Sequence, residues 1–268
     1  MFTAAITLPT APSTGLARAL RIFATETRYE FVRALRTRTF SLSVIGFPIM
    51  FYCLFGLMMN RGASVNGQQF AKYLLGTYAV FGMVGAALFG IGVGVAGDLS
   101  AGWLELKRAS PMPPIAYLLA KCCTAMAFGV IIVSILAALG TTLGHVPLTL
   151  PEYGHMIVLT LAGAVPFASM GLALALLVPF NSAPGVANLL YLPMSFLGGL
   201  WLPLTLLPKA VQKIAPFLPT YHLGQLMLGI FGYANKDSTS SHWLGLLGFT
   251  LIMLGIAALA FHRREQNS

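Results

Sequence analysis

The side chains that could carry chemistry in this chain are few, and most lie at predicted loops or helix ends. His145 and His155 flank a short predicted turn, with Glu152 between them. Two histidines and an acid could bind a metal ion, but their spacing fits no standard zinc site, so we favour loop histidines over ligands. His222, in the sequence TYH, favours a hydrogen-bonded structural role over catalysis. We therefore predict no catalytic residue, no metal site and no cofactor bound by this chain.

Sequence motifs for hydrolysis and for nucleotide binding are also absent. The sequence contains no G-x-S-x-G, no H-E-x-x-H and no paired acids within an apolar segment. It contains no G-x-x-x-x-G-K-[ST], so a Walker loop for ATP is missing. A stand-alone membrane enzyme or a sensor scaffold is still the competing functional class.

Ionisable residues are nearly missing from the deep parts of the apolar segments, where Ser, Thr, Asn and Tyr supply the polar groups. Ion-coupled transporters place acids or histidines at that depth. Lys121 is the exception, but it lies within about two helical turns of the predicted inner boundary and can snorkel to the surface. Any driving force for transport must come from elsewhere, and a partner ATPase is the natural source.

The composition indicates that lipid is the solvent around the elements that carry these residues. The chain has 268 residues, 57% of them hydrophobic and 9% charged, whereas soluble domains contain about 25% charged residues. The mean hydropathy is +0.81, which excludes a disordered chain as well. The formal charge of +9 comes from bases at segment boundaries, so nucleic acid is not a predicted partner. The three cysteines all lie in apolar stretches and form no disulfide framework.

Six apolar segments are long enough to cross about 30 Å of hydrocarbon as helices. They cover residues 40–59, 73–97, 116–143, 156–178, 183–206 and 243–261. Of the sixteen Lys and Arg residues, eleven flank one side and five the other, which places both termini in the cytoplasm. The sequence therefore predicts an all-α, six-span integral membrane protein with a single membrane domain.

Three segments are not expected to span the membrane. Residues 16–38 form a basic amphipathic helix that suits the inner membrane surface and its anionic lipids, although a plain positive-inside anchor is the alternative. Residues 98–114 form a cytoplasmic loop whose apolar and charged side chains suit docking on another protein, or merely a solvated spacer between two spans. The outer stretch 203–233 is broken by prolines, and we expect short re-entrant or interfacial helices that cap a cavity or fill space.

Two helix faces stand out within the spans. Gly82, Ala86, Gly90 and Gly94 recur every fourth residue, a small-residue ridge that allows close helix packing, within the chain rather than between subunits in our interpretation. On the fifth span, Asn188, Tyr191 and Ser195 lie at helical spacing and give it a mildly polar face. That face could line a translocation path for an amphipathic substrate or hydrogen-bond to neighbouring helices.

Two blocks of sequence resemble the type-two family of ABC transporter permeases, bacterial exporters whose ATPase is usually a separate chain. One is GWLELKRASPMPPIAYLLAK, residues 102–121, which resembles the family's loop between spans two and three. The other is FLGGLWLPLTLLPKAVQKIAPFLPTYHLGQLMLGI, residues 196–230, which resembles its fifth span and outer short helices. The order of segments agrees across nearly the whole chain.

Residues 1–15 lack a basic n-region and are interrupted by prolines, so we expect a flexible tail rather than a signal peptide. The resemblance implies an interfacial connecting helix (16–38), a six-span permease domain (39–262) and a cytoplasmic tail (263–268) in the bacterial inner membrane. It implies a coupling helix that contacts the ATPase through Gly102, Trp103, Leu104, Glu105, Lys107, Arg108 and Ser110. Two permeases, identical or different, would assemble with two ATP-binding subunits that hold ATP and Mg²⁺. Substrate would pass between the permeases, near spans one, two and five. Because the sequence shows no signature of a polar, aromatic-lined channel, we prefer a hydrophobic or amphipathic drug-like compound, with a lipid-linked glycan or a lipid as the alternative.

Overall fold

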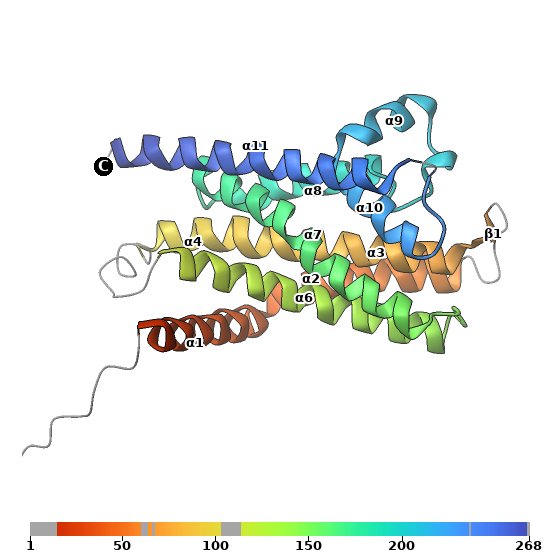
Figure 1. Ribbon diagram of the computed structural model, residues 1–268, viewed down its shortest axis with the longest axis horizontal. Coiled ribbons are helices and arrows are strands. Elements are labelled where there is room, and N and C mark those ends of the chain that lie inside the picture. The colour runs from red at the N-terminus through yellow and green to blue at the C-terminus, as the bar shows by residue number, and fades with distance from the viewer. Residues whose placement is uncertain (1–14, 60–63, 66–67, 103–113, 236, 267–268) are drawn as a thin grey trace, which may run out of the picture.

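The computed structural model describes residues 15–59, 64–65, 68–102, 114–235 and 237–266 as a bundle of long helices (Figure 1). Five helices in this part of the chain are long and apolar enough to cross a membrane: Arg38–Met58, Phe70–Ser100, Ala116–Thr142, Leu150–Leu177 and Thr239–Arg264. Each of them coincides with one of the six segments expected from hydropathy. The expected coupling residues from Trp103 to Ser110 lie outside the described residues.

The N-terminal helix α1 (Gly15–Arg36) is separate from the first span. Thr37 lies between them with φ −75° and ψ 86°, outside the helical region, and α2 (Arg38–Phe51) begins at the next residue. The first span then continues as the π-helix η1 (Tyr52–Met58). A two-stranded antiparallel hairpin, β1 (Ser64–Val65) and β2 (Gln68–Gln69), follows at the far end of the bundle.

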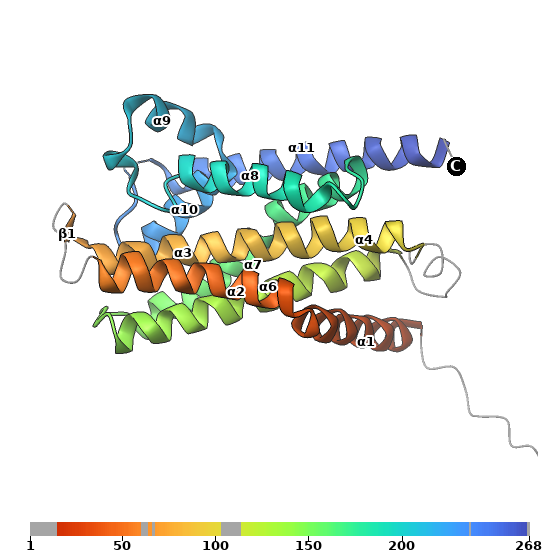
Figure 2. The same ribbon diagram turned by 180° about the vertical axis from the view of Figure 1, so that it is seen from behind.

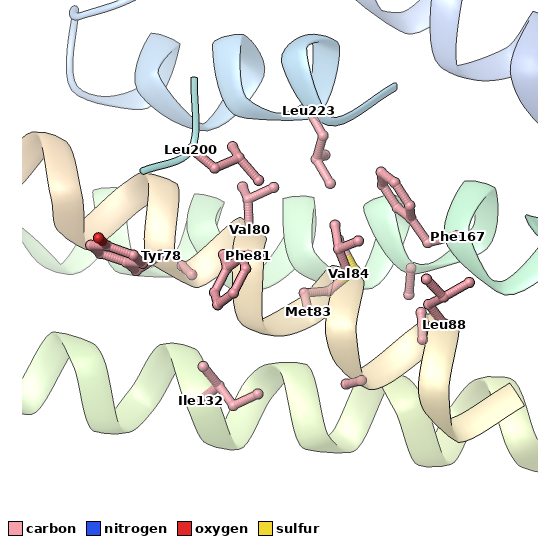
Figure 3. Packing of buried hydrophobic residues seen from close by; sticks show 14 of the residues in the cluster. Tyr78, Val80, Phe81, Met83, Val84, Leu88, Ile132, Phe167, Leu200 and Leu223 are labelled. Atoms are coloured by element: carbon pink, nitrogen blue, oxygen red, sulfur yellow. The ribbon is translucent and has the colours of Figure 1, made fainter. Parts of the chain in front are cut away.

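The second span forms the centre of the bundle. It consists of α3 (Phe70–Ala87), the π-helix η2 (Leu88–Val93) and α4 (Gly94–Ser100). All residues of α3 except Tyr73 are buried, because α2, α6, α7 and α10 pack around it. Figure 3 shows α3 side chains such as Phe81 and Met83 between Ile132 of α6, Phe167 of α7 and Leu223 of α10. This span is therefore held by protein on nearly all sides.

The third and fourth spans are α6 (Pro114–Thr142) and α7 (Leu150–Leu177). The start of α7 is fixed by a capping box, in which the Thr149 hydroxyl accepts a hydrogen bond from the backbone N–H of Glu152 and the Glu152 carboxylate accepts one from the backbone N–H of Thr149. The last span, α11 (Thr239–Gln266), packs mainly against α7. Only 22% of its most apolar window is buried, so most of its surface is left for lipid.

The expected fifth span, residues 183–206, is shorter in the structure than the sequence predicted. Helix α8 (Ala183–Leu197) has 15 residues, and about 20 are needed to cross the hydrocarbon as a straight helix. Hydropathy overestimated its length because the apolar run continues past the helix end, where Gly199 takes φ +77° and the backbone leaves the helical conformation. Among the described residues, the six predicted spans therefore correspond to five long helices and one shorter apolar helix.

The stretch after α8 forms short helices, as the prolines predicted. They are η3 (Leu204–Leu206), α9 (Lys209–Ile214), η4 (Ala215–Phe217) and α10 (Pro219–Ile230). α10 is buried between α3, α7 and α11, whereas every residue of α9 is at least partly exposed. These helices and the hairpin lie at one end of the bundle, and α1 and the C-terminal end of α11 lie at the other (Figure 1).

Candidate functional site: a lateral cavity and a buried ion network

A cavity of about 750 Å³ lies among α1, α2, the second span, α6 and α8. Figure 2 shows α2 and α8 on either side of α3 and α4, which supply the cavity's inner wall. Lining residues such as Ser43, Phe47 and Asn188 are exposed to the outside of the chain. The cavity therefore opens sideways, between α2 and α8.

Aromatic rings form a large part of the cavity wall. The Tyr191 ring stacks on Phe81 with centroids 4.6 Å apart and meets Phe89 edge to face. Trp201 lies edge-on to Phe81 and 5.6 Å from Phe51. The remaining lining aromatics are Phe40, Phe47, Phe128 and Phe180. Such rings offer flat apolar surfaces to a ligand with little loss of side-chain entropy.

The aromatic wall was not foreseen from the sequence, which we interpreted as lacking an aromatic channel signature. Its residues come from α2, α3, η2, α6, α8 and the loops after α7 and α8, so no single segment displays them together. The Tyr191 hydroxyl donates to the backbone carbonyl of Phe81, 2.9 Å away. That bond leaves the ring, rather than the hydroxyl, as the part of Tyr191 that a ligand meets.

The three residues expected to form a polar face on the fifth span do not all lie at the cavity. Asn188 and Tyr191 line the cavity. Ser195 does not, since its side chain is fully buried near the end of α8. The expected translocation-path residues therefore include two at the cavity and one in the interior.

The small-residue ridge faces both neighbouring helices and the cavity. A methyl group on Gly82 would lie 2.7 Å from a carbon of Ile132 and 2.9 Å from Pro48, so this position lets α3 approach α6 and α2. Ala86, Gly90 and Gly94 line the cavity. In the described residues the ridge thus serves packing within the chain and leaves room at the cavity wall.

Charged side chains meet at one end of the cavity in an ion network made of Glu30, Arg33, Asp98 and Lys121, with Tyr117. The Lys121 ammonium lies 2.9 Å from a Glu30 oxygen and 3.0 Å from an Asp98 oxygen. Arg33 lies 2.8 Å from the other Asp98 oxygen, and the Tyr117 hydroxyl donates to Asp98. Two acids and two bases balance each other in charge at this site.

Burial of the network is deep for every charged group except Arg33. The side chains of Asp98, Lys121 and Glu30 are 1%, 7% and 8% exposed, and that of Arg33 is 55% exposed. Burial on its own would lower the pKa of Arg33, but the ion pair with Asp98 raises it overall. The Arg33 guanidinium is therefore a permanent cation at the border between network and surface.

Sequence reasoning missed this network. Lys121 was expected to snorkel, but it is buried and points at two carboxylates, because α1 brings Glu30 across to it. The signal that could have revealed it is a pair of opposite charges, Asp98 and Lys121, at the facing ends of two apolar segments joined by a short loop. Ionisable groups in such positions need a partner.

The opposite end of the bundle carries its own polar contacts. Lys72 of α3 lies 2.7 Å from Glu152 and donates to the carbonyl of Pro147, so Glu152 is engaged there and in the α7 cap. His222 and His242 meet with their Nδ1 atoms 3.0 Å apart. Among the described residues no three His, Cys, Asp or Glu side chains gather in a way that could hold a metal ion.

Comparison with known proteins agrees with the arrangement of segments. Residues 22–232 match the family described as "ABC-2 type transporter". The chain is 29% identical over 195 residues to a Bacillus subtilis (strain 168) protein named "Putative transport permease YvfS", a match that covers 73% of this chain and 79% of that protein. The matched region takes in α2 to α10 together with most of α1, hence every residue that lines the cavity and the whole ion network. Since the family match covers most of the chain, the protein is a multi-pass transport permease and belongs to the ABC-2 type transporter family.

Proposed function

We propose that this chain is the membrane permease of an ATP-driven exporter that moves a hydrophobic or amphipathic, drug-like compound out of the cytoplasm or the inner leaflet. The cavity carries this proposal. Its wall is mostly aromatic and aliphatic, and its charged groups lie at one end. An apolar or amphipathic molecule fits such a site, because its body gains from burial against the rings.

ATP hydrolysis belongs to a separate ATP-binding subunit, which holds ATP and Mg²⁺. The sequence has no nucleotide-binding motif of its own, and family membership supports such a partner. The subunit would dock at residues 102–110, where Trp103, Glu105, Lys107 and Arg108 supply the contacts. This end of the bundle would face the cytoplasm together with both termini.

A second permease copy, identical or related, would cover the open side of the cavity. Both helices at the opening expose large apolar side chains, including Leu42 and Phe47 on α2 and Leu189 and Leu192 on α8. The paired permeases would enclose a path between them in the inner membrane. Lipid would cover the remaining exposed surfaces, including most of α11.

A lipid-linked glycan or a lipid is the second candidate cargo. Aromatic side chains also bind the apolar faces of sugar rings, and the cavity has nine aromatic lining residues when its phenylalanines, Tyr191 and Trp201 are counted together. The two cargo classes differ in what must be supplied to vesicles, so one assay separates them.

The test is ATP-dependent uptake into inverted membrane vesicles that contain the permease and its ATP-binding subunit. Ethidium serves as the amphipathic aromatic probe, and a fluorescent lipid-linked oligosaccharide serves as the alternative cargo. Co-purification of the two subunits is measured on the same membranes. Failure of the subunits to associate, or uptake that does not need ATP, would contradict the proposal.

A matched pair of variants tests whether the cavity is the path. Asn188→Trp places an indole in the cavity, whereas Leu251→Trp places one on α11, at a residue that is 61% exposed and does not line the cavity. We expect Asn188→Trp to lower the uptake rate about tenfold, the effect of about 1.4 kcal/mol of lost binding. Leu251→Trp is expected to leave uptake close to that of the unmodified chain, and equal loss in both variants would argue against the cavity as the path.

A further inference from the structure

The ion network joins three elements that are far apart in the sequence. Two residues one helical turn apart on α1 reach two different spans: Glu30 contacts Lys121 of α6, and Arg33 contacts Asp98 of α4. Lys121 and Tyr117, both on α6, also contact Asp98. Each element is thus tied to the other two by at least one short polar contact.

Stability alone gives little reason for charged groups at this place. Bringing acids and bases into a poorly polar environment costs free energy that their attraction roughly offsets, and apolar residues of similar volume often stabilise a protein as well. Charged networks differ from apolar contacts in one respect. Their hydrogen bonds are directional, so they resist the sliding of one helix past another. The network is therefore suited to hold α1, α4 and α6 in fixed positions relative to one another.

The network also borders the cavity, so the relative position of these three helices affects the shape of the cavity. Glu30, Arg33 and Lys121 line its charged end. α1 continues through Thr37 into α2, and Thr39, Ser43 and Phe47 of α2 form part of the opening. A displacement of α1 would therefore move one side of the opening.

We propose that the ion network makes α1 move as one body with the inner ends of α4 and α6, so that motion of these ends opens or closes the cavity. The proposal rests on the proposed function, because the ATP-binding subunit must act at the loop that joins α4 to α6. Glu30 and Arg33 are positioning residues in this scheme. They act through the helices and do not need to touch the transported compound.

The central variant is Glu30→Gln combined with Arg33→Gln. It removes one acid and one base, so the net charge is unchanged, and it leaves the Asp98, Lys121 and Tyr117 contacts between α4 and α6 in place. Gln has a helix propensity close to that of Glu and Arg. The control is Arg21→Gln with Arg28→Gln, two exposed residues of the same helix. The charge-retaining variant Glu30→Asp with Arg33→Lys tests for rescue.

The measurement uses the permease with its ATP-binding subunit in lipid nanodiscs. Cys53, Cys122 and Cys123 are replaced by Ala, and Ser43→Cys places a thiol in the cavity opening. The rate at which N-ethylmaleimide labels this thiol is compared without nucleotide and with ATP plus vanadate. ATP hydrolysis and subunit association are measured on the same samples.

We expect ATP plus vanadate to change the labelling rate in the parent and in the control. In the central variant the hydrolysis and the association persist, but the change in labelling rate is reduced about fivefold or more, the lower end of typical coupling between sites. The charge-retaining variant regains a substantial part of the response.

Two results would overturn this inference while leaving the proposed function intact. One is a full labelling response in the central variant. The other is loss of subunit association in that variant and not in the control, which would assign the network a structural role only. If the parent complex itself neither associates nor responds to ATP, the proposed function fails, and the inference fails with it.

Discussion

Lys121 is the residue on which the charge balance of the ion network depends. Its ammonium contacts both Glu30 and Asp98, and it lies 5.1 Å from the centre of the Tyr117 ring. Two neighbouring helices, α1 and α4, supply the acids, and α6 itself supplies Tyr117. From the sequence alone, the long side chain of Lys121 was expected to reach the membrane surface. In the structure it links two buried acids instead.

Replacing Lys121 by Met should destabilise the fold strongly. The change keeps the length of the side chain but removes the ammonium that contacts both Glu30 and Asp98, and breaking a buried ion pair costs about 3 kcal/mol. Unfolding by SDS in mixed micelles measures the loss, with Lys121→Arg as the control that keeps the charge. Equal stability of the Met and Arg variants would show that the charge of Lys121 is not needed.

Single residues of the site were only partly predictable from the sequence. Asn188 and Tyr191 were found because their helical spacing and polarity are local properties. The contact between Glu30 and Lys121 joins positions 91 residues apart, and the aromatic wall is gathered from several elements, so both depend on tertiary packing. No pattern within one segment contains that information.

At the scale of elements, hydropathy located the spans well. α6 and the observed first and second spans begin and end within a few residues of the expected ones, because a lipid-crossing helix must satisfy its own backbone and be apolar along its length. The predicted length of the fifth span was wrong for a physical reason. Apolarity continues past Leu197, but the turn at Gly199 is a backbone property that hydropathy does not measure.

The close packing of the second span gives a test at this scale. Gly82→Ala should destabilise the protein by about 1–3 kcal/mol, since the added methyl group would lie within 3 Å of both Ile132 and Pro48. Gly154→Ala is the control, because that position on α7 has open space around it. The two variants are compared by the same SDS titration. A loss of stability in Gly154→Ala as large as in Gly82→Ala would contradict the packing argument.

At the scale of the whole molecule, the two ends of the bundle differ in their charged groups. α1, with its exposed arginines, lies at the same end as Arg263 and Arg264 of α11 (Figure 1). The hairpin and α9, with Lys209 and Lys213, lie at the opposite end. The excess of Lys and Arg at the first end favours the cytoplasm for it.

Reporter fusions test this orientation directly. We expect a reporter inserted at Ser64 or at Ser238, both exposed in the structure, to indicate the outer side of the membrane. A reporter fused after the C-terminal residue is expected to indicate the cytoplasm. The opposite orientation would be shown if a reporter enzyme that works only in the cytoplasm were active when inserted at Ser64 and Ser238.

The single residue between α1 and α2 limits how the N-terminal helix can travel. Thr37 offers only its own two backbone dihedral angles as a joint, so α1 can swing or roll about that point but cannot slide independently of the first span. The helix therefore acts as a lever that pivots at Thr37. Tilting its free end, by lipid or by a protein, would transmit torque straight into α2.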